Sequence, residues 1–308
     1  MKKINKVLLA LVLSTAAMAI SASEKAATFV VAFAQDDLSN DWRLAQVKDA
    51  QGVFEAYPDV EFVYTDGQGQ TALQVAHIHQ LIEQKIDALI TSPREILGAS
   101  QVIREAYERG IPVILLDRHV DHAAYSTFLH NDNYNIGLRA AQFLDSALEG
   151  KGRILMLEGL PGATPTILRR EGFINFMEQR PGIELVARTG NYLRRDAILI
   201  LEEFLSQGNH FDAIYSHSDS MLEGARMVMK RYDINPGDIP TVGIDYIQGA
   251  QDALLAGQQS ASFTYPTLGE EGAEAALTLL AGEIFPKTIM NESIMVTVEN
   301  ATEIVPIF

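Results

Sequence analysis

The chain has 308 residues, of which 47 % are hydrophobic, and it carries a formal net charge of −16. This length and apolar content suffice for two hydrophobic cores, and the acidic charge argues against nucleic acid and anionic membrane surfaces as partners. The sequence contains no cysteine, which excludes both a disulfide framework and a lipid anchor on cysteine.

The first 23 residues have the layout of a secretory signal peptide. A basic region at 1–6 precedes an apolar run over 7–20, and small residues follow at 21–23. The alternative, a permanent membrane anchor, is disfavoured because the apolar run is too short and no stop-transfer flank follows it. We therefore expect a cleaved signal peptide, residues 1–23, and a mature protein in the periplasm.

From residue 28 onward, short apolar runs alternate with amphipathic helical patterns. The first series predicts strands at 28–34, 61–64, 88–91, 113–116 and 127–130, with helices at 41–56, 70–84 and 99–109. The second predicts strands at 153–157, 184–188, 213–216 and 241–244, with helices at 133–148, 165–178, 196–206 and 219–232. Two such series without a polar linker predict an α/β fold with two doubly wound, parallel-sheet lobes.

The last part of the chain predicts a strand at 260–264, a helix at 268–281 and a strand at 294–298. If these pieces complete both sheets, the chain crosses between the lobes more than once, and several crossovers at one edge form a multi-strand hinge. The expected N-terminal lobe comprises 24–131 and 266–289, and the expected C-terminal lobe comprises 132–265 and 290–308.

Polar side chains follow the predicted strands, and ligands of parallel α/β sheets bind beyond the carboxyl ends of the strands. Asp117 and Arg118 follow one apolar strand, Asp245 follows another, and the large rings of Trp42 and Tyr192 stand at similar positions. Sugar hydroxyls both donate and accept hydrogen bonds, and flat rings can cover the C–H faces of a sugar. The pattern therefore favours a sugar site, although core packing of Trp42 and a local Asp117–Arg118 ion pair stay open as alternatives.

Catalytic and metal-binding patterns are weak in this sequence. His119 and His122 lack a third ligand nearby, so exposed loop histidines are the favoured interpretation. The adjacent Asp36 and Asp37 are expected at a solvated edge of the sheet. The chain has no Gly-x-Ser-x-Gly elbow, no cysteine nucleophile and no complete phosphate loop. We expect no enzyme activity, no cofactor and no metal.

Several of these segments resemble the type I periplasmic sugar-binding proteins, whose fold is shared with the ligand domains of LacI-type repressors. The resemblance spans about 28–298. It rests on SNDWR at 39–43, IPVILLDR at 111–118, LEGLPGATPTILRREGF at 157–173, VGID at 242–245 and TYPTLGEEG at 264–272. Within the family, the set looks closest to the galactofuranose-binding members.

The resemblance implies a set of ligand-binding residues. Ser218 and Tyr265 depart from the family pattern, which usually has Asn at the first position and, in ribose binders, often Gln at the second. The expected ligand-binding residues are Asn40, Trp42, Arg43, Asp117, Arg118, Asn133, Arg169, Tyr192, Ser218, Asp245 and Tyr265.

The function implied by the resemblance is that of a substrate-binding protein of an ABC sugar importer. Such a protein closes two lobes around a monosaccharide, here galactofuranose-like or related, and then docks on the permease in the inner membrane. The alternative is a periplasmic sensor that presents its ligand to a membrane receptor kinase or chemoreceptor, and the sequence does not separate the two. We expect a monomer. A repressor is disfavoured, because a signal peptide stands where a DNA-binding helix-turn-helix would lie.

Overall fold

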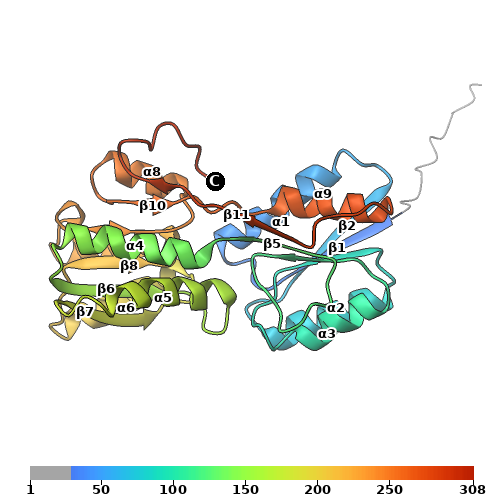
Figure 1. Cartoon of the computed structure of the whole chain (residues 1–308), viewed down its shortest axis with the longest axis horizontal. Coiled ribbons are helices and arrows are strands. Elements are labelled where there is room, and N and C mark those ends of the chain that lie inside the picture. Colours follow the sequence, from blue (N-terminus) through green and yellow to red (C-terminus); the bar gives the residue numbers. More distant parts are fainter. Residues whose placement is uncertain (1–28) are drawn as a thin grey trace, which may run out of the picture.

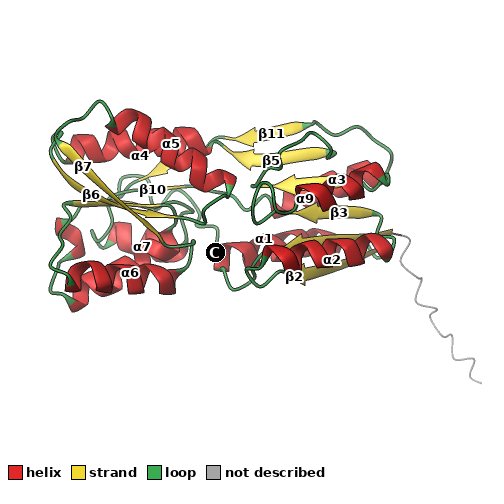
Figure 2. Ribbon diagram, turned by 90° about the horizontal axis from the view of Figure 1, so that it is seen from below, coloured by secondary structure: helices red, strands yellow, loops and turns green. Residues whose placement is uncertain are grey.

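The computed structural model of the chain describes residues 29–308 and consists of two lobes that lie side by side (Figures 1 and 2). The predicted signal peptide lies outside the described residues. Within 29–308, no helix is long and apolar enough to cross a membrane.

The first lobe is built on a six-stranded parallel sheet in the order β11-β5-β4-β3-β1-β2. Apolar residues alternate between the two faces of its central strands, so both faces are covered by helices. Helices α1 and α9 pack on one face and α2 and α3 on the other (Figure 1). The strands are β1 (Phe29–Gln35), β2 (Val60–Asp66), β3 (Ala88–Thr91), β4 (Val113–Leu116), β5 (Thr127–Asn131) and β11 (Thr288–Asn291). The helices are α1 (Asp41–Phe54), α2 (Thr71–Glu83), α3 (Ser100–Glu108) and α9 (Gly269–Leu280).

The second lobe is built on a four-stranded parallel sheet in the order β7-β6-β8-β9. Helices α4 and α5 cover one face, and α6 and α7 cover the other. The strands are β6 (Gly152–Glu158), β7 (Ile183–Thr189), β8 (Ala213–Ser216) and β9 (Thr241–Val242), beside an antiparallel pair of β10 (Ser262–Phe263) and β12 (Met295–Val296). The helices are α4 (Asn133–Ala147), α5 (Thr164–Met177), α6 (Arg194–Ser206), α7 (Asp219–Arg231), α8 (Gln248–Leu255) and the short 3-10 helix η1 (Pro236–Asp238).

The chain passes between the two sheets at three places within residues 29–308: between β5 and α4, between β10 and α9, and between β11 and β12. Three neighbouring connections between two sheets have the form expected for a hinge. Met290 and Asn291 still pair with β5. They lie just beyond the expected lobe limit at 289.

The predicted fold class, two doubly wound parallel lobes, is confirmed. Strands β3, β4 and β8 occupy the expected residues. Three elements were not predicted: α8, β11 and the 3-residue 3-10 helix η1. Helix α8 has only 8 residues, too few for a clear helical period, and the edge strand β11 has no buried residue, so its sequence lacks an apolar run. The strand expected at 241–244 ends at Val242, because the next residues form a turn with positive φ at Asp245 and Tyr246.

Candidate ligand-binding site between the lobes

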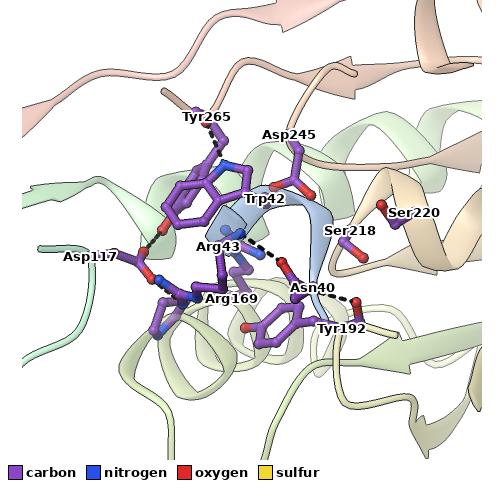
Figure 3. A pocket seen from close by; sticks show the side chains of 11 residues that line it. Asn40, Trp42, Arg43, Asp117, Arg169, Tyr192, Ser218, Ser220, Asp245 and Tyr265 are labelled. Atoms are coloured by element: carbon purple, nitrogen blue, oxygen red, sulfur yellow. Dashed lines mark hydrogen bonds and ion pairs between the residues drawn. The ribbon is translucent and has the colours of Figure 1, made fainter. Parts of the chain in front are cut away.

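The carboxyl ends of both sheets face a cavity that encloses about 390 Å³. Residues from both lobes converge on it, and most of the side chains around it are buried (Figure 3). The residues that line it are Asn40, Trp42, Arg43, Asp117, Pro165, Arg169, Tyr192, Ser218, Ser220, Asp245 and Tyr265.

Nine of the eleven residues expected to bind ligand line this cavity; Arg118 and Asn133 do not. Two lining residues, Pro165 and Ser220, were missed by the sequence analysis. Each follows a strand end closely: Pro165 lies in the first turn of α5 after β6, and Ser220 lies two residues after Ser218. The rule that ligands bind beyond the carboxyl ends of parallel strands could therefore have found both residues. The residue types themselves, a proline and a single serine, do not indicate a binding site.

Trp42 both lines the cavity and packs in an apolar cluster. Its indole Nε1 donates a hydrogen bond of 3.0 Å to the carbonyl of Tyr265, and the two rings lie 5.6 Å apart. Although Trp42 belongs to α1 of the first lobe, the apolar cluster around it consists of second-lobe residues and Tyr265 at the crossover. The two interpretations of Trp42, core and cavity wall, are both correct, because the core in question lies across the lobe junction.

Asp117 is held by two neighbours that also line the cavity. Its carboxylate accepts hydrogen bonds from Arg43 Nη2, at 2.6 Å, and from the hydroxyl of Tyr265. Burial by itself raises the pKa of Asp117, but the nearby Arg43 and Arg118 outweigh it and hold the pKa below its ordinary value. Asp117 is therefore an ionised acceptor at neutral pH.

Arg118 is turned away from the cavity toward Asp36, with Nη1 2.7 Å from Asp36 Oδ2. Arg94 and Arg43 also pair with Asp36, at 3.4 and 3.6 Å. The expectation that Asp36 lies at a solvated edge is wrong: the residue is 2 % exposed. Burial opposes ionisation, yet Arg118 and Arg43 keep the pKa of Asp36 below its ordinary value. Asp36 thus links Arg118 to Arg43, which does line the cavity.

Asn133 likewise stands behind the lining residues. It accepts a hydrogen bond of 2.8 Å from Arg169 Nε and donates one of 3.1 Å to the hydroxyl of Tyr265. The guanidinium of Arg169 lies 4.4 Å from the centre of the Tyr265 ring, and its Nη1 donates to the carbonyl of His217. Arg169 is therefore fixed on three sides.

Tyr192 supplies a second ring on the cavity wall. Its hydroxyl forms a hydrogen bond of 2.7 Å with Thr166, and its φ is +64°. A Cβ on Gly159 would lie 1.9 Å from the ring, so a larger residue at 159 would displace Tyr192. Asp117 and Asp245 also have positive φ, at +65° and +111°. Strained backbone of this kind is typical of functional sites.

Unlike the carboxylate of Asp117, the carboxylate of Asp245 forms no hydrogen bond or ion pair with the other side chains drawn in Figure 3. Burial raises the pKa of this carboxyl well above its ordinary value, and Arg169 opposes the rise. Asp245 is thus the lining acid whose oxygens are available to a ligand as acceptors, at a desolvation cost that ligand hydroxyls can offset.

Besides the contacts of Tyr265 with Trp42 and Asp117, four contacts join the lobes around the cavity. The amide of Asn40 donates a hydrogen bond of 3.0 Å to the carbonyl of Tyr192, and Arg194 pairs with Asp41 at 3.2 Å. Ile96 N donates to the carbonyl of Gly162 at 3.3 Å, and His119 N donates to Thr164 Oγ1 at 3.1 Å. The two lobes are therefore in direct contact on several sides of the cavity.

Metal chemistry finds no support in the described part of the chain: it contains no group of three or more potential ligands among His, Cys, Asp and Glu. The expectation of exposed loop histidines is wrong. His119 is half-buried and contacts Tyr125 and Phe128, and His122 Nε2 lies 2.8 Å from the carbonyl oxygen of Ser100.

A two-lobed α/β protein with an enclosed cavity of aromatic and charged side chains at the facing strand ends defines the class of solute-binding proteins. Comparison with known proteins agrees. A family profile described as a periplasmic binding protein domain matches residues 31–284. The chain therefore belongs to the periplasmic binding protein family, and the resemblance found in its sequence is confirmed.

Individual relatives are sugar binders by name. The chain is 29 % identical over 261 residues to the galactofuranose-binding protein YtfQ of Escherichia coli (strain K12), covering 82 % of each chain. It superposes with a TM-score of 0.84 and 29 % identity on a Mycobacterium smegmatis protein in complex with β-D-fucofuranose, over 89 % of this chain and 93 % of that one. The chain also superposes on the periplasmic binding component of the arabinose ABC transporter from Shewanella sp. ANA-3, bound to α- and β-L-arabinofuranose. The TM-score is 0.81 and the identity 27 %, over 89 % of this chain and 93 % of that one.

Proposed function

We propose that this protein is the periplasmic substrate-binding component of an ABC sugar importer, which binds a monosaccharide of the galactofuranose type or a related sugar and leaves it chemically unchanged. The relatives that bind galactofuranose, fucofuranose and arabinofuranose by name support a furanose as the ligand.

The observation that carries the proposal is the composition of the enclosed cavity. Three aromatic rings, those of Trp42, Tyr192 and Tyr265, stand on its wall together with two arginines and two aspartates. Rings suit the C–H faces of a sugar, and charged donors and acceptors suit its hydroxyls. The cavity has an empty volume of about 390 Å³, including open solvent, and both lobes contribute to its lining.

In this proposal the residues have two kinds of role. The nine expected residues that line the cavity contact the sugar, with Trp42 and Tyr192 on opposite sides of the ring. Arg118 acts through Asp36 on Arg43, and Asn133 acts through Arg169 and Tyr265. These two residues are assigned a supporting role instead of contact with the sugar because they do not line the cavity.

Ligand capture would proceed by hinge closure, with the expected lobes, 24–131 with 266–289 and 132–265 with 290–308, as the two moving bodies, except that Met290 and Asn291 move with the first lobe because they pair with β5. The three neighbouring crossovers support this division. Closure is a shift in population toward the state in which both lobes contact the sugar. A micromolar dissociation constant corresponds to about 8 kcal/mol, which several charge-assisted hydrogen bonds and two ring contacts can supply.

The closed form would dock on an inner-membrane permease as a monomer, after export by the signal peptide at 1–23. The name of the Shewanella relative as an ABC-transporter component supports this choice over presentation of the ligand to a sensor kinase. Pull-down with detergent-solubilised permease encoded nearby in the genome, compared with a neighbouring receptor kinase, distinguishes the two partners.

The function is tested by isothermal titration calorimetry of the mature protein against a panel of pentoses and hexoses, including L-arabinose, D-galactose, D-fucose and D-ribose. The single tryptophan gives an independent fluorescence signal. We expect micromolar, saturable binding of a sugar with an accessible furanose form. If no sugar binds and another class of solute raises the melting temperature, the sugar proposal is wrong while the binding-protein fold stands.

A further inference from the structure

A buried carboxylate that does not line the cavity, Asp219, occupies the first position of α7. It is fully buried and accepts three hydrogen bonds. Oδ1 accepts from Gln259 Nε2 at 2.8 Å, and Oδ2 accepts from Ser262 Oγ at 2.5 Å and from the backbone N–H of Tyr246 at 2.8 Å. The third bond is the important one, because Tyr246 directly follows the cavity residue Asp245.

The turn that carries Asp245 is strained. Asp245 has φ +111° and Tyr246 has φ +56°, a region that residues other than glycine rarely adopt. Two consecutive residues in this region persist only where surrounding contacts hold them. The Asp219 carboxylate provides such a contact on one side of the turn. On the other side, the hydroxyl of Tyr246 donates to the carbonyl of Ala301 at 2.5 Å, and Ile307 N donates to the carbonyl of Tyr246 at 3.2 Å.

The neighbouring residues Gly243 and Gln259 fix the position of the Asp219 carboxylate. A Cβ on Gly243 would lie 1.8 Å from Asp219 Oδ1, so the glycine makes room for the carboxylate. Gln259 is itself fixed, because its Oε1 accepts from Arg226 Nη1 and its Nε2 therefore faces Asp219. All partners of Asp219 in this cluster are thus donors, and a carboxylate satisfies every one of them.

We propose that Asp219 is a positioning residue for ligand binding, whose carboxylate holds the strained Asp245–Tyr246 turn so that the Asp245 carboxylate projects into the cavity between the lobes. This inference rests on the proposed function, since it takes Asp245 to contact the sugar. The charge of Asp219 also acts on Asp245. Burial and the negative charges of Asp219 and Asp117 raise the pKa of Asp245, whereas the positive charges of Arg169 and Arg43 lower it.

The first variant is Asp219→Asn. An asparagine can still accept from Tyr246, but its amide then directs N–H groups at Gln259 Nε2, also a donor, and one bond of the cluster is lost. We expect affinity for the sugar that binds the wild type best in a panel of L-arabinose, D-galactose and D-fucose to fall at least about tenfold. Asp238→Asn, which removes an exposed carboxylate from the same lobe, is the matched control and should bind as the wild type does.

The second variant separates positioning from general stability. In Asp219→Asn/Gln259→Glu, the new amide donates to the new carboxylate, which also pairs with Arg226, so the bond between positions 219 and 259 is restored with donor and acceptor exchanged. The bond that Gln259 Nε2 donates to the carbonyl of Ala261 at 3.1 Å is not restored, so the recovery is incomplete. We expect this double variant to recover affinity to within about threefold of the wild type. If Asp219→Asn folds and binds within twofold of the wild type, or if the double variant recovers melting temperature but not affinity, the proposal is wrong.

A third readout needs no ligand and therefore remains valid if the proposed function fails. Carboxyl ¹³C NMR titration follows the pKa of Asp245 directly. We expect it to fall toward the ordinary aspartate value in Asp219→Asn, both because a like charge is removed and because the turn opens and Asp245 becomes hydrated. Ser262→Ala keeps the charge of Asp219 and removes one of its bonds, so a fall of the Asp245 pKa in that variant reports the turn alone. An unchanged pKa of Asp245 contradicts the proposal. Should Asp219→Asn not fold, Ser262→Ala removes a single bond from the same oxygen without a mismatched donor and should weaken binding about threefold.

Discussion

The side-chain amide of Asn40 donates a hydrogen bond of 3.0 Å to the backbone carbonyl of Tyr192, which joins the start of α1 in the first lobe to a loop of the second. The same side chain caps α1, since its Oδ1 accepts from the backbone N–H of Arg43 at 3.0 Å. One residue thus begins a helix in one lobe and closes the cavity against the other.

The two roles of Asn40 can be separated by substitution. Asn40→Ser keeps a good N-cap but is too short to reach Tyr192, so we expect ligand affinity to fall about fivefold with little change in melting temperature. Asn40→Ala should also lose the cap, which costs about 1 kcal/mol of stability. Calorimetry and thermal unfolding of both variants check this, and equal melting temperatures for the two would contradict the capping role.

The ion pair between Asp41 and Arg194 joins the lobes at the surface, while Arg194 also pairs with Glu223 within its own lobe at 2.8 Å. We expect Asp41→Asn to weaken ligand binding by less than about fivefold, mainly through faster release, because exposed pairs contribute little. The loss should shrink at high salt. Glu223→Gln removes only the contact within the lobe and is the matched control; an equal effect of both changes in stopped-flow release experiments would contradict a closing role for Asp41.

Trp42 packs across the lobe junction and lines the cavity. Trp42→Ala should abolish measurable sugar binding and lower the free energy of unfolding by about 3 kcal/mol, whereas Trp42→Phe should retain most stability and part of the affinity. Because the sequence has a single tryptophan, binding by these variants is measured by calorimetry instead of fluorescence. Unchanged affinity in Trp42→Ala would contradict the proposal that the indole ring of Trp42 contacts the sugar.

Asp36 neutralises buried arginines behind the cavity. Asp36→Asn removes the carboxylate that lies 2.7 Å from Arg118 and leaves Asp117, at 3.8 Å, as the carboxylate that still pairs with this buried arginine. We expect a loss of about 3 kcal/mol in urea unfolding together with weaker ligand binding through Arg43. Asp37→Asn, at the less buried neighbouring position, serves as the control and should unfold as the wild type does. A stability loss of less than about 1 kcal/mol in Asp36→Asn would show that the arginines are solvated.

We expect the buried carboxylate of Asp245 to lower the free energy of unfolding at neutral pH although it contributes to ligand binding. Its native pKa is raised by burial, so between the unfolded and native pKa values the native state holds a proton that the unfolded state has lost. Stability from this group is complete below the unfolded pKa and is lost as the pH rises through the native one. Asp245→Asn should therefore be more stable than the wild type at pH 8, by about 1.4 kcal/mol for each unit of the shift, and the difference should shrink as the pH falls.

The comparison of Asp245→Asn with the wild type cancels titrating groups that do not interact with Asp245, such as His217, whose pKa burial lowers well below its ordinary value. Urea unfolding from pH 5 to pH 8 gives the stability difference, and calorimetry should show weaker sugar binding by the same variant. A wild type more stable than Asp245→Asn at pH 8 would show that the carboxylate has a compensating partner.

The sequence by itself determined the fold class and most of the cavity. Apolar runs such as 113–116 and 213–216 predict buried strands because a parallel sheet is covered on both faces, and the residues that follow them are delivered to one edge of the sheet. That geometric rule is local, and it placed Asp117, Ser218 and Asp245 correctly at the cavity. The resemblance added Arg169 and Tyr265, which no strand-end argument selects with the same force.

Only the tertiary structure decided which charged groups face the cavity and which stand behind it. Asp36 and Arg118 pair across 82 residues of sequence, and Asp219 reaches Tyr246 across 27. Such pairings depend on how strands are ordered in a sheet and on which strand ends therefore meet within one lobe. A periodic pattern specifies which face of an element is buried, but a buried carboxylate and a solvated one have the same sequence signature until the arginines that neutralise it are in place.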